Sequence, residues 1–235
     1  MEEYKVRACK VGDATGIGKN NVSAFWEETF WRLLWVPDRT RDEVIDMVAL
    51  RSPKNLLSER NTRRHQLVEH VPTGEIVGYC RWYLPDSCEG QWLEAQTPGV
   101  SKEETQRYEE QYAGVNFNYR TDMDDMDVPI HAMRAKHTPK KPYIELSHLA
   151  CHPGHQRKGI ASLLVSQGLE QASRLGLEVM ALAAGRRSLV LYKKLGFEVV
   201  DGVVQSLKPY GAPSDEDVSS MHIVIKRCAD AATLA

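Results

Sequence analysis

Apolar residues in this sequence follow two spacings, one typical of β-strands and one typical of α-helices. Short runs that are apolar, or that alternate with polar residues, predict strands at 4–11, 64–71, 75–84, 143–151, 178–183, 197–201 and 221–227. Apolar positions three or four residues apart predict helices at about 22–33, 41–52, 101–113, 159–175 and 188–195. The order of these elements predicts an α+β fold with a mixed, largely antiparallel sheet and helices on both faces.

Local signals predict where individual elements begin and end. Thr40 and Glu43 have the spacing of a capping box, so a helix should begin just after Thr40, and Pro53 should end it. Gly16 and Gly18 are typical of a loop ahead of the first helix. The aromatic rings of that helix either belong to the core or line a binding pocket, and they are Trp26, Phe30, Trp31 and Trp35.

The segment from 85 to 142 is polar, contains several prolines and is far longer than a connection between strands requires. We therefore expect an insertion within a single domain that spans residues 1–235. Ser101 and Glu104 form a second capping box, which predicts a helix that ends near Ala113. The acidic run at 122–127 lacks the glycine and the distant glutamate of a calcium loop, so it is expected to be a solvated face that could attract a cationic acceptor.

Composition narrows the possible classes of function. A formal net charge of −2 over 235 residues gives no overall attraction to nucleic acid or to an anionic membrane. No apolar run reaches the length of a membrane helix and residues 1–5 lack the order of a secretory signal, so we expect a soluble cytoplasmic protein with a frayed end at 229–235. The five cysteines show no Cys-x-x-Cys spacing, which predicts reduced thiols. No metal site is predicted, because His148, His152 and His155 have no partner cysteines.

The most specific pattern lies between residues 143 and 197. A strand-like run ends at Cys151, Pro153 and Gly154 force a turn, and a helix follows from Gly159. The first N–H groups of a helix have no intrahelical acceptor and carry a partial positive charge. Gly159 lets a bulky anion approach the backbone, and Ala161 keeps the next turn small. This loop is therefore predicted to bind phosphate.

The same stretch resembles the GCN5-related N-acetyltransferase (GNAT) family, whose signature is Gln/Arg-x-x-Gly-x-Gly/Ala at the head of a helix. Gln156, Gly159 and Ala161 match this signature, and Leu-Tyr-Lys-Lys-Leu-Gly-Phe at 191–197 resembles the closing motif of the family. The resemblance implies the acyl-CoA N-acyltransferase fold, with six to seven strands and the insertion just before the central strand. It also implies acetyl-CoA as cosubstrate, with its pyrophosphate held by the backbone amides of Gln156, Arg157, Lys158, Gly159, Ile160 and Ala161.

The resemblance also implies where the rest of the coenzyme would lie. Its pantetheine arm would form hydrogen bonds with the strand edge near Leu149 and Cys151, and the side chains of Arg157 and Lys158 could reach its phosphates. The family commonly has an asparagine seven residues before the tyrosine of the closing motif. Here that position is Gly185, so the side-chain contact to the arm is not expected.

Acyl transfer to an amine needs a base, an acid and a donor to the oxyanion. Glu145 lies eleven residues before Gln156, the spacing at which histone acetyltransferases of this family carry their glutamate base, although a surface ion pair is its alternative role. His148 is the rival base, but strand alternation predicts that it points away from Glu145. Tyr192 occupies the acid position of the family, and the N–H of Leu149 would stabilise the oxyanion.

Together these residues predict an acetyl-CoA-dependent N-acetyltransferase that transfers the acetyl group directly to a primary amine in a ternary complex. A covalent intermediate on Cys151 is not expected, because nothing nearby in the sequence lowers the pKa of its thiol. A small molecule or polyamine is the favoured acceptor. The alternatives are a protein N-acetyltransferase and a non-catalytic acyl-CoA-binding regulatory module. The insertion at 85–142 could fold over the acceptor site as a lid.

Overall fold

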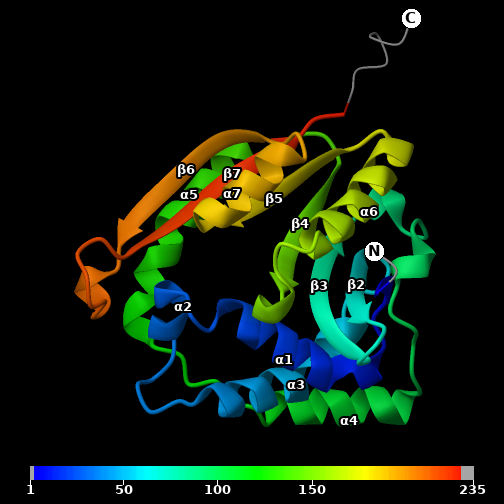
Figure 1. The fold of residues 1–235 in the computed structure, drawn as a ribbon. Helices are drawn as coiled ribbons and strands as arrows, with labels where there is room; N and C mark the ends of the chain where they lie inside the picture. The colour runs from blue at the N-terminus through cyan, green and yellow to red at the C-terminus, as the bar shows by residue number, and fades with distance from the viewer. Residues whose placement is uncertain (1–2, 229–235) are drawn as a thin grey trace, which may run out of the picture.

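The computed structural model describes residues 3–228, which form one seven-stranded sheet in the order β1-β2-β3-β4-β5-β7-β6 (Figure 1). The strands are β1 (Tyr4–Ala8), β2 (Arg63–His70), β3 (Glu75–Tyr83), β4 (Tyr143–Cys151), β5 (Glu178–Ala184), β6 (Glu198–Ser206) and β7 (Val218–Lys226). All seven predicted strands are present, and β6 extends beyond its predicted end at residue 201. The end expected to be frayed, 229–235, lies outside the described residues.

Neighbouring strands of the sheet are antiparallel, with one exception at its centre. β4 and β5 run parallel and pair only from Tyr143 with Glu178 to Leu146 with Ala181. Beyond that pair the two strands diverge, as Figure 1 shows, so the second half of β4 has a partner on the β3 side alone. The largely antiparallel mixed sheet predicted from the sequence is confirmed.

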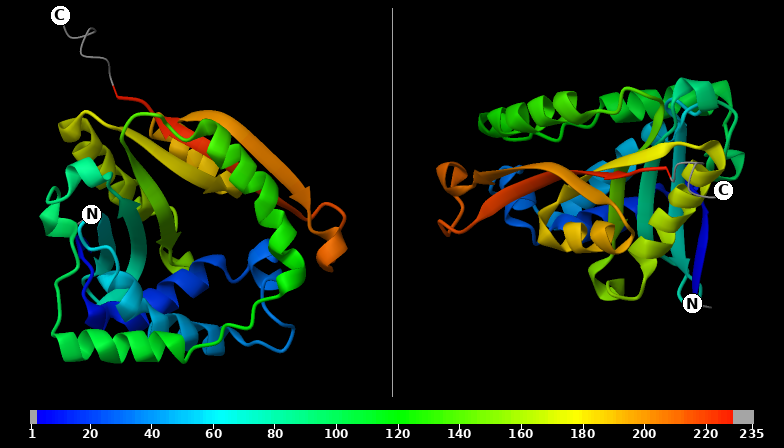
Figure 2. Two further views of the ribbon diagram at one scale, coloured as in Figure 1. Left: turned by 180° about the vertical axis from the view of Figure 1, so that it is seen from behind. Right: turned by 90° about the horizontal axis from the view of Figure 1, so that it is seen from above.

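Helices cover both faces of the sheet, as predicted. They are α1 (Ala14–Phe25), α2 (Thr29–Leu33), α3 (Arg41–Leu57), α4 (Lys102–Ala113), α5 (Asp127–His137), α6 (Ile160–Leu175) and α7 (Gly185–Lys194). One face carries α6 and α7; the other carries α1, with α3 packed on α1, and α5 against β6 and β7 (Figure 2). None of the helices in the described part of the chain has the length and apolar character needed to cross a membrane.

The core on the α6 side is built around Trp82 of β3, which is fully buried. Gly168 of α6 lies directly on this indole ring, because a Cβ at position 168 would be 2.2 Å from Trp82 Cζ2. Leu164 and Val165, also fully buried, belong to the same apolar cluster. This close approach fixes α6 against the sheet, and with it the loop at the N-terminus of α6.

The first helix differs from its prediction at both ends. It begins at Ala14, so Gly16 and Gly18 are helical rather than part of a loop. Gly18 lies where α1 crosses α3: a Cβ there would be 3.0 Å from the carbonyl oxygen of Ile45. The helix also ends at Phe25, and the aromatic residues after it belong partly to the separate helix α2. A tertiary contact, which no local signal reports, explains the glycine in this helix.

The sequence predicted that Pro53 would end α3, and this prediction is wrong: the helix continues to Leu57. Proline inside a helix costs about 3 kcal/mol. Packing of the last turn offsets this cost, since Leu56 is 2 % exposed and packs with Ile17 and Leu67. The predicted start of α3 is confirmed: Thr40 accepts from the N–H of Glu43, and the Glu43 carboxylate accepts from the N–H of Thr40.

The inserted segment follows the outside of the molecule for most of its length. Its first part is attached to β2 by Arg64, a fully buried side chain that donates hydrogen bonds to the carbonyls of Gln91 and Trp92. The helix predicted from Ser101 is α4, which packs against α3 (Figure 1). A further helix that the sequence did not predict, α5, packs against β6 and β7.

Candidate active site

The unpaired half of β4 exposes backbone groups toward the gap that separates it from β5. The N–H of His152 donates to the carbonyl of Val77 at 3.0 Å, so His152 forms a hydrogen-bonded pair with β3. Pairs of this kind alternate along an antiparallel ladder, which directs the backbone groups of Ala150 to β3 as well. The N–H and C=O groups of Leu149 and Cys151 therefore point toward the gap, and no strand pairs with them there.

A β-bulge in β4 changes which side chains share a face. The pairing of β4 with β3 slips by one residue at Ser147, so that one strand carries an extra residue. As a result His148 pairs with Arg81 and Glu145 pairs with Tyr83, two residues on the same face of β3. The prediction that His148 points away from Glu145 is therefore wrong, and both side chains lie on the face covered by α1 and α5.

The six residues predicted to cradle phosphate, 156–161, join the end of β4 to α6. Gly159 caps α6 with φ +84°, a conformation that favours glycine, and Arg157 also has a positive φ of +61°. The first backbone bond of the helix runs from the N–H of Leu163 to the carbonyl of Gly159, at 2.9 Å. The N–H of Gln156 donates to the carbonyl of Pro153 at 3.3 Å, whereas the N–H groups of 157–162 have no acceptor in the helix. The side chains of Arg157 and Lys158 are exposed.

Tyr192 of α7 is brought close to the unpaired part of β4. Its ring is 3 % exposed and packs edge-on against Phe197, with centroids 5.1 Å apart. Burial raises the pKa of the Tyr192 phenol, and Cys80 is near enough to raise this pKa further. Since Cys80 is the β3 partner of Leu149, the phenol and the Leu149 backbone belong to one region of the structure. Tyr192 therefore keeps its proton at neutral pH.

Glu145 is held in an ion pair that crosses to the inserted segment. Its carboxylate accepts a hydrogen bond from Arg134 of α5 at 2.5 Å, and its side chain is 12 % exposed. The pair joins β4 to α5 on the face opposite α6. The ion pair uses Oε2 of this carboxylate, so Oε1 is the oxygen left to accept a proton from an amine.

His148 lies beside Glu145 on the same face, in contact with the rings of Phe25 and Tyr79 at centroid distances of 5.7 and 5.5 Å. Burial, and after it the charge of Arg81, lowers the pKa of His148 to about 4. The imidazole is therefore neutral at pH 7. Its Nε2 atom is buried and has no hydrogen-bond partner within residues 3–228.

Two other predicted features can be placed in the structure. Cys151 ends β4, and burial raises the pKa of its thiol to about 11, so the sulfur is protonated at neutral pH and is a poor nucleophile. Gly185 begins α7 with φ +70°, so this position uses a backbone conformation that favours glycine. No cluster of three metal-ligating side chains occurs within residues 3–228.

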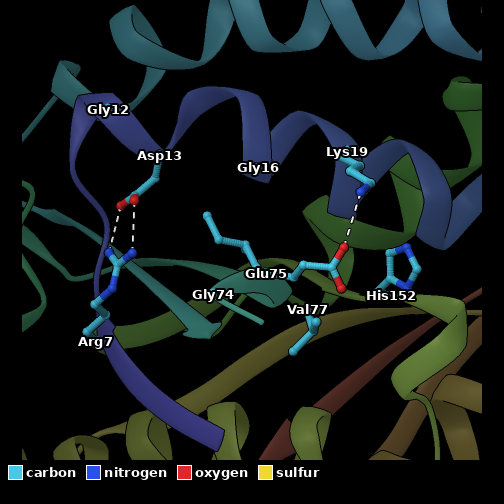
Figure 3. A pocket seen from close by; sticks show the side chains of 10 residues that line it. Arg7, Gly12, Asp13, Gly16, Lys19, Gly74, Glu75, Val77 and His152 are labelled. Atoms are coloured by element: carbon cyan, nitrogen blue, oxygen red, sulfur yellow. Dashed lines mark hydrogen bonds and ion pairs between the residues drawn. The ribbon is translucent and has the colours of Figure 1, made fainter. Parts of the chain in front are cut away.

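The larger of the two cavities described here lies away from these residues. It has a volume of about 290 Å³ and lies between the start of α1 and the β2–β3 turn (Figure 3). Its charged side chains pair with one another: Arg7 with Asp13 at 2.8 Å and Lys19 with Glu75 at 3.3 Å. His152 is its one contact with the loop that follows β4. This cavity holds none of the residues expected to act in catalysis.

A strand edge that is free on one side and leads to N–H groups at a helix N-terminus can bind an extended ligand that carries an anionic group at one end. The sequence profile of the Acetyltransferase (GNAT) family matches residues 26–197. The chain therefore belongs to the GNAT family of acetyltransferases, and the family predicted from the loop motif is confirmed.

Solved structures show the same fold. One is described as histone acetyltransferase HPA2 and related acetyltransferase from Corynebacterium glutamicum, with 19 % identity, a TM-score of 0.58 and 97 % of each chain covered. Another is the C-terminal condensation domain of Ebony in complex with β-alanyl-dopamine, with 13 % identity, a TM-score of 0.60, and 94 % of this chain and 98 % of that chain covered. At these identities the similarity concerns the fold alone.

Three residues near the site were missed by the sequence analysis. The bulge at Ser147 has no local signature, because it is defined by pairing with another strand. Arg134 contacts Glu145 from a helix that was not predicted. Arg81 could have been noticed, because it is a charged residue among the apolar and aromatic residues that follow Glu75 in this strand.

Proposed function

We propose that this protein transfers the acetyl group of acetyl-CoA directly to a primary amine. The observation that supports this most is the continuity of the free β4 edge with the N-terminus of α6. The backbone groups of Leu149 and Cys151 would bind the amides of the pantetheine arm, and the N–H groups of 157–161 the pyrophosphate, since that of Gln156 already donates to Pro153. Arg157 and Lys158 would add positive charge beside the phosphates.

The chemistry we propose needs one proton removed and one supplied. An alkylammonium has a pKa near 10.4, so freeing its lone pair at pH 7 costs about 4–5 kcal/mol. The amine nitrogen attacks the thioester carbon, an N–C bond forms, and the C–S bond breaks. Tyr192 supplies a proton to the leaving thiolate, and the N–H of Leu149 stabilises the oxyanion.

Glu145 is the base in this proposal, and Arg134 holds one of its two carboxylate oxygens in place. The other oxygen, Oε1, would take the proton from the acceptor ammonium, directly or through a water molecule. His148 stays the rival base, because the bulge at Ser147 places it on the same face. Its lowered pKa makes it available as a neutral imidazole but a weak proton acceptor.

The test is release of free thiol from acetyl-CoA across a panel of small amines, polyamines and peptides with free amino groups, together with calorimetry of coenzyme A binding. We expect coenzyme binding and thiol release with at least one class of amine. Gly159→Glu should abolish binding, because it places a carboxylate and a strained backbone at the proposed phosphate site. Release with peptides alone would indicate a protein N-acetyltransferase. Coenzyme binding without thiol release from any amine would contradict catalysis and favour a regulatory module.

A further inference from the structure

A second cavity lies on the face of the sheet that α1 covers, between β4, β3 and the helices α1 and α3. Its volume is about 90 Å³, and it is lined by Ile17, Asn21, Val48, Ser52, Asn55, Leu56, Tyr79, Arg81 and His148. His148 directly precedes Leu149, whose backbone faces the gap between β4 and β5. His148 therefore brings this cavity within one residue of the position at which acyl transfer is proposed.

Arg81 brings an incompletely bonded positive charge to this cavity. One N–H of its guanidinium donates to Ser147 Oγ at 3.0 Å, while its Nε–H is buried without a partner within residues 3–228. Within residues 3–228, every acidic side chain that forms an ion pair does so with a basic residue other than Arg81. An arginine N–H buried without an acceptor is costly unless a ligand supplies one.

The other polar groups of the cavity also favour an acceptor atom in the ligand. His148 is neutral, and its buried Nε2 has no partner within residues 3–228, so it can donate a hydrogen bond in the appropriate tautomer. The side-chain oxygen of Asn21 already accepts from Asn20 at 3.0 Å, which leaves its NH₂ group to donate. Asn55 supplies a further amide. No acidic residue lines the cavity, in contrast to the larger cavity, whose charges neutralise one another.

We propose that this cavity binds a carboxylate of the acceptor, so that the natural acceptor is a small amine that also carries a carboxylate group. This inference rests on the function proposed above and specifies its substrate class. The planar fork of Arg81 suits the two oxygens of a carboxylate. The apolar residues Ile17, Val48 and Leu56 would pack against the methylene groups between carboxylate and amine.

The proposal also discriminates among amines. A polyamine would bring a second ammonium group toward Arg81, which is a repulsive contact at short range. An amino acid would instead pair its carboxylate with Arg81 and direct its ammonium toward Glu145 on the same face. We therefore expect polyamines to be poor acceptors, although the sequence alone favoured them together with other small amines.

The first experiment compares matched acceptors by thiol release from acetyl-CoA. β-Alanine and γ-aminobutyrate are tested against propylamine and butylamine, which have the same number of carbon atoms after the nitrogen but lack the carboxylate. We expect the amino acids to have kcat/KM at least tenfold higher, because a charge-assisted hydrogen bond in a partly buried site contributes that much or more. Arg81→Gln should remove this preference by raising KM for the amino acids at least tenfold more than for the alkylamines.

Two further variants separate binding from folding. Asn55→Leu fills the cavity from α3 without touching the Arg81–Ser147 contact, and should raise KM for the amino acids about tenfold. Arg63→Gln is the matched control, since Arg63 lies over the same Tyr83 ring as Arg81 but lines neither cavity. It should leave the preference intact. An undiminished preference for amino acids in Arg81→Gln would overturn the proposal, as would equal rates for the amines and amino acids in the unaltered protein.

A binding measurement distinguishes failure of this inference from failure of the proposed function. Propionate is titrated into the unaltered protein and into Arg81→Gln while the imidazole resonance of His148 is followed by NMR, with propylamine as the control ligand. A shift with propionate that is lost in Arg81→Gln supports the carboxylate site even if no amine releases thiol. The same propionate response in both proteins, or none in either, overturns it even if amines are acetylated.

Discussion

Replacement of Tyr192 by phenylalanine tests the acid in the proposed reaction with little disturbance of the fold. The substitution removes one hydroxyl group and keeps the ring that packs against Phe197 at 5.1 Å. The side chain is 3 % exposed and lies in the main apolar cluster, so its packing is preserved in the variant. We expect the free energy of unfolding to change by no more than about 1 kcal/mol, the usual contribution of one hydroxyl hydrogen bond.

The expected loss of turnover is much larger than the loss of stability. Proton transfer from a positioned group contributes about 10²–10⁴ to the rate. We expect the lower end, because a thiolate with a pKa near 8.5 is already a fair leaving group. A 100-fold lower kcat corresponds to about 2.7 kcal/mol of transition-state stabilisation. Since burial raises the pKa of Tyr192, its ionisation should add no falling limb to the pH profile near neutrality.

Steady-state thiol release gives kcat, and calorimetry gives the dissociation constant for coenzyme A, which should change less than about twofold. Lys193→Gln is a suitable control, because Lys193 is on the same helix but exposed. Turnover within threefold of the unaltered protein would remove Tyr192 from the mechanism. A loss of coenzyme affinity as large as the loss of kcat would instead assign Tyr192 to binding.

Three further predictions concern stability. Gly168→Ala should lower the free energy of unfolding by about 2 kcal/mol in chemical denaturation, because so close an approach to Trp82 should cost about 3 kcal/mol, the upper end of the usual cost of overpacking, and better helix propensity returns about 1; an unchanged midpoint would mean that α6 can move away from Trp82. Arg64→Met should lower the free energy of unfolding by about 3 kcal/mol, because it leaves the carbonyls that Arg64 bonds without a donor. A decrease below about 1 kcal/mol would show that Arg64 does not hold the first part of the insertion on β2. Burial lowers the pKa of His65 to about 3 and that of His148 to about 4. Because the unfolded chain then binds more protons below pH 6.5, stability should be full above that pH and fall toward pH 4, with a smaller slope in His65→Gln, and an equal slope in that variant would contradict this assignment.

Sequence reasoning located the parts of this fold that short segments specify. β4, its loop and α6 were predicted because an apolar strand, Pro153-Gly154 and the helical spacing after Gly159 are all local signals. The capping boxes before α3 and α4 were local too. Gly18 and Pro53 were misread because contacts with distant parts of the chain decide their conformations. In each case tertiary packing outweighed a valid local preference.

The candidate site was predictable to the same extent. Its backbone groups follow from the motif, whereas the partners of its side chains do not. The Arg134–Glu145 ion pair joins two segments that meet only because α5 packs on β6 and β7. The shared face of Glu145 and His148 depends on one extra residue in a strand pairing, and periodicity cannot show it.

The extra residue in β4, Ser147, divides the strand into two parts whose registers with β3 differ by one residue. The residues before it, from Tyr143 to Leu146, pair with β5 and so join the two halves of the sheet. The backbone groups of the residues after it have no β5 partner. Regular pairing that kept Ser147 but lacked the bulge would place Ser147 opposite Arg81 and Leu149 opposite Tyr79, so that the amides of Leu149 and Cys151 would meet β3 and those of His148 and Ala150 would face the gap. The single-residue offset thus determines which residues of β4 present their backbone groups at this edge in the centre of the sheet.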